Sequence, residues 1–494
     1  MGRRSGRGEF MAGVVVAAGP DAESVARGVA RDVARDGESA GGPVGAERQW
    51  PSSRAAYWAL FVIILATFLN FFDQTVFGML AQRIKVDFGL TDEQLGFLGG
   101  PATVIFFVFA GIPLARLADI YPRKLVLAGG MAATGLVMGL GGLAQGFGQF
   151  VGSRMFLGAG GSAHAPAAYS MIADYFPPKK ITRAFSLLQL GFIGGSTVGV
   201  LVGGKLIVAL AGWDDPVVFG LHLHNWQLIL LGQAVLGLCA ALLLLTVKEP
   251  PRLLVPASAT ISAPPAQSLG QRILAFTGLD AARAIHARGR VYYPLFIGLA
   301  LSAIETFGLA FWRVPFMIRT YGWDEAQIGM VMAPMLLVSQ LVGVFFGGFF
   351  VEWLARRYSD ANVRAATILF ALVTVCAITS PMMPTGEASL AVMALGGMFG
   401  LAGAVPQNAA IQRIAPNEMR GQVTAIYLFM FTFFGALGSF VVGTVAQRVV
   451  GVEADLWKAL VITAGVLLPI ATFAMFMGIR PYREEVARLE AEGR

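Results

Sequence analysis

Long apolar runs alternate with short polar segments from residue 57 onward. Twelve of these runs have about 20 residues or more, the length that an α-helix needs to cross the hydrocarbon core of a bilayer. They form two sets of six, so the pattern predicts an all-α polytopic membrane protein with two six-helix bundles. The runs cover Tyr57–Ala81, Leu95–Leu117, Leu125–Gln145, Phe150–Tyr175, Ala184–Leu210, Trp226–Val247, Tyr293–Ile318, Ala326–Leu354, Ala365–Met383, Ser389–Gln412, Val423–Ala446 and Leu456–Ile479.

The same pattern divides the chain into five parts. Residues 1–54 are rich in Gly, Ala and Arg with little hydrophobic periodicity, so we expect a disordered cytoplasmic tail there. Residues 55–248 and 292–480 are predicted to be the two bundles. The Pro-rich stretch 249–291 is expected to be a cytoplasmic linker with an amphipathic segment on the membrane surface, and residues 481–494 a second cytoplasmic tail.

Composition agrees with a membrane protein and excludes several other classes. With 56% hydrophobic and 14% charged residues and a mean hydropathy of +0.66, the chain is too apolar for a soluble globule. Cys239 and Cys376 both lie within apolar runs, so we expect neither a disulfide framework nor a thiolate metal site. We also see no nucleophile with a base, no metal cluster and no phosphate loop, so we predict no enzymatic activity and no cofactor.

The basic residues predict the orientation in the membrane. The net charge of +7 is carried by short clusters between apolar runs, which argues against a nucleic-acid partner. These clusters occupy alternate loops on the side of both termini, so the positive-inside rule predicts that both termini are cytoplasmic in the cell's inner (plasma) membrane. The clusters include Arg123 and Lys124, Lys179 and Lys180, Lys248 and Arg252, and Arg356 and Arg357.

A polar stripe crosses the first apolar run. Thr67, Asn70, Asp73 and Gln74 fall on one side of a helix, and Asp73 is the only charged residue from Tyr57 to Ala81. An ionised Asp near the bilayer centre costs about 2.5 to 3.5 kcal/mol, so Asp73 must be paired, be protonated or face a watery cavity. The alternative to a role in transport is a polar contact that only holds helices together.

The two halves of the chain repeat each other. Thr91–Gly96 opens the second run with a capping-box pattern, and Asp324–Gly329 opens the eighth likewise, at an offset of 233 residues. The same offset places Asp73 opposite Thr306, next to Glu305. Each half therefore has one deep carboxylate in its first helix, and parallel duplication with a site between the halves is the architecture of one large transporter class.

Several stretches resemble known transporters. Ala115–Lys124 is similar to the loop between helices 2 and 3 of the major facilitator superfamily, and nearly all of residues 57–479 resembles its bacterial spinster-like members. This resemblance implies two six-helix bundles related by pseudo-two-fold symmetry, alternating access around a central cavity, and proton coupling in many members. The similar stretches are Asn70–Asp73, Gly89–Gly96, Asp119–Lys124, Asp174–Pro178, Lys248–Arg252, Phe311–Trp312 with Pro315, Gly347–Gly348 and Met419–Gly421.

Two positions depart from the pattern of that family. The family has Asp-Arg in helix 1 where this chain has Asp73–Gln74, and it has Glu in helix 4 where this chain has Gly161. An Arg and a Glu of the coupling site that the resemblance implies are therefore absent. Because the two missing groups have opposite charges, the losses look compensatory.

Three groups of candidate site residues follow. We predict Asp73 as the main protonation site, with Glu305 and His164 as further coupling residues, although His164 could be a packing residue. An ion pair between Asp73 and Arg154 is expected, as a coupling element or as a fixed brace. For the substrate cavity we predict Thr67, Phe68, Asn70, Gln74, Arg154, Gly161, Phe307, Trp312 and Arg313. For gating at the cytoplasmic ends we predict Asp119 with Arg123 and Lys124, and Glu352 with Arg356 and Arg357.

These observations together predict a secondary active transporter. The family resemblance implies a small amphipathic or lipid-like solute, of lysolipid or sphingoid type, and a proton gradient as the driving force. A drug or organic-anion carrier is the alternative, as is a membrane sensor that binds a lipid without moving it. The expected partners are the substrate and membrane lipids, and we expect a monomer.

Overall fold

The structure, a computed structural model, describes residues 50–162, 164–213, 216–218, 220–249, 279–415 and 420–492. Eleven helices in this part of the chain are long and apolar enough to span a membrane. The run predicted as the fourth span is helical on both sides of residue 163, which lies outside the described residues, as α7 (Phe147–Ser162) and α8 (His164–Tyr175). The predicted all-helical membrane fold is confirmed.

The first half contains the helices that follow Trp50. In addition to α7 and α8, its elements are α3 (Ser53–Phe88), α4 (Asp92–Gly99), α5 (Pro101–Ile120), α6 (Arg123–Gly142), α9 (Pro178–Ala209), β1 (Val217–Val218), β2 (Leu221–His222) and α10 (Asn225–Leu245). The two strands form an antiparallel hairpin in which Val217 pairs with His222.

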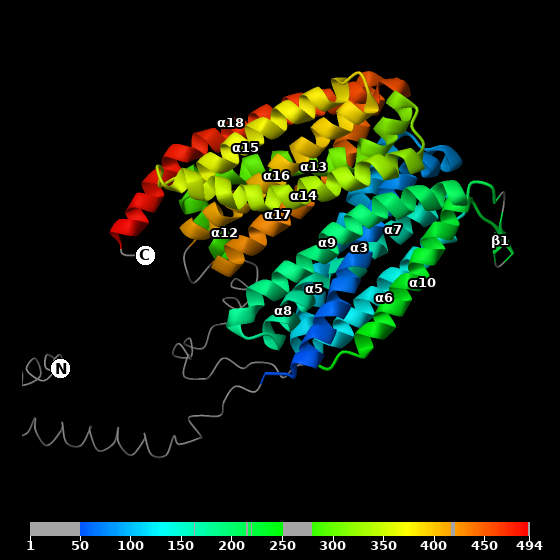
Figure 1. Cartoon of the computed structure of the whole chain (residues 1–494), viewed down its shortest axis with the longest axis horizontal. Helices are drawn as coiled ribbons and strands as arrows, with labels where there is room; N and C mark the ends of the chain where they lie inside the picture. The colour runs from blue at the N-terminus through cyan, green and yellow to red at the C-terminus, as the bar shows by residue number, and fades with distance from the viewer. Residues whose placement is uncertain are drawn as a thin grey trace, which may run out of the picture. The chain divides into compact units, whose positions relative to one another are not determined.

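The second half is formed by the helices from α12 onward (Figure 1). Its elements are α12 (Leu279–Ala287), α13 (Gly289–Tyr321), α14 (Glu325–Ala355), α15 (Ala361–Thr379), η3 (Ser380–Met382), α16 (Gly386–Ile414), α17 (Arg420–Val445), the π-helical η5 (Ala446–Val450), η6 (Glu453–Asp455) and α18 (Leu456–Ala491). The stretch predicted as a C-terminal tail is helical as far as Ala491. Most of the predicted N-terminal tail, and residues 250–278 of the linker, lie outside the described residues.

The helix starts predicted by the repeat are present. The Thr91 hydroxyl accepts a hydrogen bond from the backbone N–H of Gln94, whose side chain accepts one from the backbone of Thr91. At the equivalent place the Asp324 carboxylate accepts from the backbone N–H of Gln327. Gly89 and Gly322 end the preceding helices with φ of 61° and 69°, a left-handed conformation that glycine adopts at little cost. The internal repeat therefore extends to the helix ends.

The helices of each half pack mainly with one another, and the halves meet mainly through two helix crossings, with smaller contacts of α3 on α13 and of α5 on α17. α9 packs on α14, and α4 packs on α17. Glycine allows both crossings, because a Cβ at Gly96 would lie 2.4 Å from the Ser439 carbonyl oxygen and one at Gly329 would lie 2.8 Å from that of Val200. Small residues at the interfaces of membrane helices allow the backbones to approach each other this closely.

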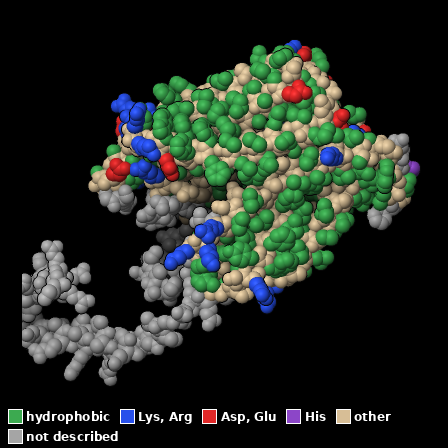
Figure 2. All heavy atoms as spheres, viewed as in Figure 1, with side chains coloured by type: hydrophobic (Ala, Val, Ile, Leu, Met, Phe, Trp, Pro, Cys, Tyr) green, Lys and Arg blue, Asp and Glu red, His purple; other side chains and the backbone are tan. Residues whose placement is uncertain are grey.

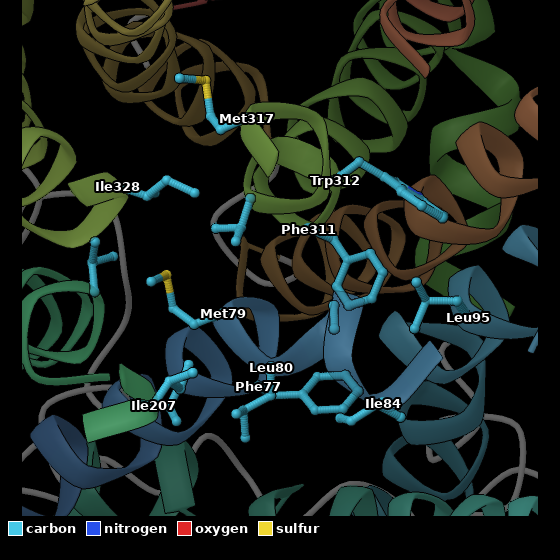
Figure 3. Packing of buried hydrophobic residues seen from close by; sticks show 14 of the residues in the cluster. Phe77, Met79, Leu80, Ile84, Leu95, Ile207, Phe311, Trp312, Met317 and Ile328 are labelled. Carbon is cyan, nitrogen blue, oxygen red and sulfur yellow. The ribbon is translucent and has the colours of Figure 1, made fainter. Parts of the chain in front are cut away.

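One hydrophobic core joins the halves at a single end of the bundles. It contains Phe77, Leu80 and Ile84 of α3 together with Trp312 of α13 and Ile328 of α14 (Figure 3). We call this the closed end, formed by residues 83–100, 311–329 and 436–455. Toward the opposite end, which we call the open end, each half has its own separate core. Among the described residues, no hydrogen bond or ion pair joins the halves at the open end.

The surface has the polarity of a membrane protein. In Figure 2 hydrophobic side chains cover most of the visible flank of both bundles, and charged side chains gather toward the ends. Exposed apolar residues such as Phe109, Phe345 and Phe349 are 68% to 77% exposed. A soluble protein does not expose so large an apolar area, so this belt is the lipid-facing surface.

The glycine contacts predict the effect of a single added methyl group. Gly96→Ala places a Cβ against backbone that cannot move aside, so the closed end should open more often. Spin labels at Val86 and Val452, both exposed at this end, report the separation when Cys239 and Cys376 have been replaced. We expect a larger population at long distance in Gly96→Ala. Gly129→Ala is the control, because nothing lies within 4 Å of its added Cβ; equal distance distributions in the two variants would contradict the prediction.

Candidate functional site

The polar stripe of α3 faces α7 and α8, which run antiparallel to it. The Thr67 hydroxyl lies 3.0 Å from Nε2 of His164. About one turn further along α3, the Asn70 side-chain nitrogen lies 4.0 Å from where a Cβ of Gly161 would be. Of the predicted site residues on α3, Thr67 lies against α8 and Asn70 against Gly161 of α7, whereas Asp73 is buried and Gln74 is exposed.

Arg154 and Asp73 are both buried but do not form the expected ion pair. The guanidinium carbon of Arg154 lies 3.4 Å from the centre of the Phe77 ring and 5.4 Å from that of Phe150. A cation over aromatic faces in a desolvated site is stabilised by about 2 kcal/mol or more. The Arg154 charge still acts on Asp73 electrostatically. The expected ion pair is therefore wrong for this conformation, because the guanidinium of Arg154 lies against aromatic rings and not against the Asp73 carboxylate.

The second half contributes residues of α13, and one prediction there is wrong. Trp312 is fully buried and donates a hydrogen bond from its ring nitrogen to the Ser439 carbonyl oxygen at 2.7 Å. It therefore belongs to the core of the closed end and does not line a cavity. Phe307, by contrast, is 40% exposed and packs edge-on against Phe431 at 5.4 Å.

Two further charged residues lie deep in α13. Glu305 is buried, and Arg313, about two turns away, is the charged group that acts on it most strongly. No ion pair joins them among the described residues. Arg313 instead lies with Nη1 3.8 Å from the sulfur of Met332, and its Nε has no hydrogen-bond partner in the described part of the chain. The predicted roles of Glu305 in coupling and of Arg313 in the substrate cavity stay predictions.

A buried charge cluster at the closed end was not predicted from the sequence. Asp92 accepts hydrogen bonds from both terminal nitrogens of Arg319 at 2.9 Å and is paired with Lys85 at 2.8 Å. Asp92 and Lys85 belong to the first half and Arg319 to the second, so the cluster joins the two halves. The bidentate geometry makes this contact strong and specific.

Three less buried pairs surround that cluster. Arg83 bonds Glu325 at 2.7 Å, and Arg448 bonds Glu93 at 2.8 Å, each across the two halves. Lys85 also reaches Glu453. Together with Asp92 and Arg319, four cations face four anions at this end. The cluster is neutral overall, which lowers the cost of burying its members.

At the open end, Arg123 has partners other than the predicted one. Its guanidinium bonds Asp174 at the end of α8 and Glu249 just after α10, and the Glu249 carboxylate also accepts from the backbone N–H groups of Arg123 and Lys124. Glu249 thereby caps α6. The Asp119 side chain lies outside the described residues, so its predicted pairing stays a prediction.

The predicted pair in the second half is not formed. Glu352, Arg356 and Arg357 are exposed and have no ion pair among the described residues. A different carboxylate organises this end: Asp360 is fully buried and bonds Arg364 of α15 and Arg483 of α18. Burial raises the pKa of Asp360, but the hydrogen bonds and charges of these two arginines outweigh burial and hold its pKa below the ordinary value.

Gln233 of α10 is a further residue that the sequence reasoning missed. It is buried at the level of Asp73, and both atoms of its amide lack partners among the described residues. A signal was available, because Gln233 is the only amide or charged side chain from Leu228 to Leu245. The described residues contain no group of three His, Cys, Asp or Glu side chains that could hold a metal.

The fold agrees with a comparison of the sequence with protein families. The Major Facilitator Superfamily model matches residues 63–439 and 295–493, and the chain belongs to that family. It is therefore a secondary transporter and not an enzyme.

Individual relatives narrow this class. The chain is 26% identical over 453 residues to an "MFS-type efflux pump" of Mycolicibacterium smegmatis, covering 89% of this chain and 96% of that protein. It is 23% identical over 318 residues to "Protein spinster" of Drosophila melanogaster, covering 63% of this chain and 48% of that protein. Among solved structures, a bacterial homolog of the human lysosomal transporter spinster, described as inward-facing and unoccupied, matches with a TM-score of 0.72 and 22% identity, covering 88% and 99% of the two chains. The chain is thus similar to spinster proteins.

The closed-end cluster predicts how one lost charge changes the conformation. Asp92→Asn leaves Arg319 buried without its anion and leaves Lys85 with Glu453 alone, and breaking a buried pair typically costs about 3 to 5 kcal/mol. The closed end should therefore open, and a cysteine at Leu98, which is fully buried there, should react at least about tenfold faster with a water-soluble thiol reagent.

Arg448→Gln is the matched control for Asp92→Asn. Arg448 is 67% exposed in its pair with Glu93, and exposed pairs contribute only about 0 to 1 kcal/mol, so labelling at Leu98 should change little. If Asp92→Asn labels no faster than this control, the buried cluster does not hold the end closed.

Proposed function

We propose that this chain carries a small amphipathic or lipid-like solute across the membrane by alternating access, coupled to protons at Asp73. The observation that carries the proposal is the buried Asp73 carboxylate in α3, beside the polar stripe that faces α7 and α8. Partly exposed Phe68 and Phe307 supply apolar surface from the two halves. A carboxylate that can take up a proton, next to mixed polar and apolar surface, suits a solute with a polar head and an apolar body.

Protonation provides a physical reason for coupling. An ionised Asp73 is costly wherever it is shut away from water, and a neutral one is not. A state in which the site is sealed therefore favours the protonated form, and a state open to water favours the ionised form. Because each form favours a different conformation, a proton gradient can drive the cycle in one direction. His164 and Glu305 are secondary candidates for this exchange.

The orientation completes the proposal. We place both termini and the open end at the cytoplasmic face of the cell's inner membrane, because the basic loops lie there. The described conformation is then inward-open, as the bacterial spinster homolog with the similar fold is described to be. The cytoplasmic pairs around Glu352, Arg356 and Arg357 would form when that end closes. We expect a monomer with membrane lipids as its surroundings.

Efflux of drug-like compounds is the second candidate. It is favoured by the "MFS-type efflux pump" of Mycolicibacterium smegmatis, which matches this chain over nearly the whole length of both proteins. The chemistry of the site is compatible with either solute, since both combine an apolar body with a polar or charged group.

Transport by purified protein in liposomes tests the proposal. We expect a fluorescent lysophospholipid to accumulate when a pH gradient is imposed and not otherwise. Accumulation of ethidium alone would favour the second candidate. Binding of lysophospholipid, measured by thermal shift, without movement of either probe would indicate a sensor and overturn the transport proposal.

Asp73→Asn tests the coupling residue in the same assay. This variant cannot ionise, so accumulation against a gradient should be abolished while binding persists. Glu305→Gln is the matched comparison and should retain accumulation. Loss in Glu305→Gln with normal accumulation in Asp73→Asn would move the coupling site to α13.

Labelling of two exposed positions in the second half tests the orientation. With Cys239 and Cys376 replaced, a cysteine at Glu387 should react in whole cells with an impermeant thiol reagent, and one at Arg356 should not. Asp360 is unsuitable for this purpose because it is buried and paired. The reverse pattern would invert the topology.

A further inference from the structure

A small polar cavity lies inside the first half, between α3, α6 and α10. Its volume is about 30 Å³, whereas one water molecule needs roughly 10 to 15 Å³ by the same kind of measure. Its polar lining comes from Asn70 and Asp73 of α3, Thr134 of α6 and Gln233 of α10. The remaining lining is apolar or glycine: Leu69, Phe72, Met131, Gly135, Met138, Leu236 and Gly237.

Two side chains lining this cavity have polar atoms without partners. Asp73 and Gln233 are each only 7% exposed. Oδ1 of Asp73 and both amide atoms of Gln233 make no hydrogen bond to any described residue. Buried polar groups in native proteins are nearly always hydrogen-bonded, to protein or to water. Two such side chains in one cavity of this size therefore point to a shared ligand that both donates and accepts.

We infer that this cavity is a water site in which Gln233 holds a water molecule against the carboxyl group of Asp73, so that Gln233 is a positioning residue for the protonation of Asp73. The role in protonation rests on the coupling proposed above, whereas the water site does not. Water fits both states of the carboxyl group. It donates to the ionised carboxylate and accepts from the protonated acid, and the amide of Gln233 can reverse its part accordingly.

The charges around Asp73 favour water over a cation. The positive charge of Arg154 acts on the same carboxylate from α7 and opposes a second cation. α6 and α10 contribute only uncharged groups to the cavity, so no second carboxylate compensates. Ionisable groups on the helices packed against α3 lie elsewhere. His164 contacts Thr67, Asp174 pairs with Arg123, and Glu305 and Arg313 lie on α13. The remaining groups are exposed on α9 or belong to the closed end: Lys179, Lys180, Arg183 and Lys205, and Asp92, Glu93 and Arg319.

The site has a consequence for the transport cycle. The water lies within the first half, on helices of that half alone, so it stays with Asp73 when the two halves move. Asp73 then has a hydrogen-bond partner even when the surface facing α7 and α8 is sealed from bulk water. The carboxyl group can change protonation without a bare charge in the bilayer.

The pH dependence of gradient-driven uptake tests the role of Gln233. Gln233→Met keeps the volume of the side chain and removes its hydrogen bonds. The ionised carboxylate of Asp73 loses a water-mediated hydrogen bond, so the pH at half-maximal uptake should rise. The expected rise is about one pH unit, which corresponds to the free energy of one hydrogen bond to a charged group. Gln407→Met is the matched control, because Gln407 is a buried glutamine of the second half with an unpartnered Nε2. An unshifted profile in Gln233→Met would overturn the role.

Thr134→Val provides a second, milder variant of the same cavity. It replaces a hydroxyl with a methyl group and should move the profile in the same direction as Gln233→Met by a smaller amount. If Gln233→Met does not fold, an unshifted Thr134→Val profile would overturn the role on its own.

Infrared difference spectroscopy tests the water site without transport. The carboxyl C=O band of protonated Asp73 is identified by its loss in Asp73→Asn, and it should move to higher frequency in Gln233→Met as its hydrogen bond is lost. An unmoved band would overturn the water site. If Asp73→Asn still accumulates substrate while the band moves in Gln233→Met, the proposed coupling fails and the water site stands.

Replacing sodium with N-methylglucamine separates water from a cation. Wild-type uptake should be unchanged at equal pH gradient. A sodium requirement that Gln233→Met abolishes would show a cation site at this cavity and overturn the inference.

Discussion

Backbone lies against backbone where the two halves of this protein meet, and that constraint governs the closed end. Gly96 and Gly329 bring α4 onto α17 and α14 onto α9, at equivalent places of the internal repeat. At these two glycines the contact is between backbones, so it needs no side chain to change its rotamer when the helices part. The helices can therefore separate and re-form as rigid surfaces, which is what alternating access requires of the helices that seal one face.

The charge cluster beside these crossings can also separate and re-form when the closed end opens and closes. Asp92 and Arg319 are buried and stable only while the halves are together. On opening, both charges return to water, which repays most of the lost attraction. The balance of four cations and four anions means that neither half is left with a large excess of one sign. A closed end of this kind combines strong, specific contacts with a modest difference in free energy between states.

The sequence predicted the elements that depend on local pattern. Twelve apolar runs indicated the spans, and the pairs Thr91–Gln94 and Asp324–Gln327 indicated the helix starts, because a capping box acts within one turn. The polar stripe of α3 also follows from helical periodicity alone. These features need no knowledge of which helices are neighbours.

Contacts between segments far apart in the chain could not be predicted from the sequence. Arg319 is separated by 227 residues from Asp92 along the chain, and its charge close to a helix end looks like any interfacial arginine. Trp312 was predicted to line the cavity together with Phe68 and Phe307, yet the approach of α17 buries it. Arg154 was expected to pair with Asp73, but the sequence did not indicate that the ring of Phe77, on the same helix as Asp73, would lie against the guanidinium.

The contact between α3 and α7 explains the two departures from the family pattern, Gln74 and Gly161, in physical terms. Gly161 lies opposite Asn70, so Gln74, four residues further along α3, is about 6 Å from the level of Gly161. An arginine at 74 is long enough to reach back over that distance to a glutamate at 161, so a pair there could be lost together without any change in the backbone. Its loss leaves neutral Asn70 beside Gly161 and removes a cation from the neighbourhood of Asp73. The carboxyl group is then left with the cavity that it shares with Asn70 and Gln233 as its polar surroundings.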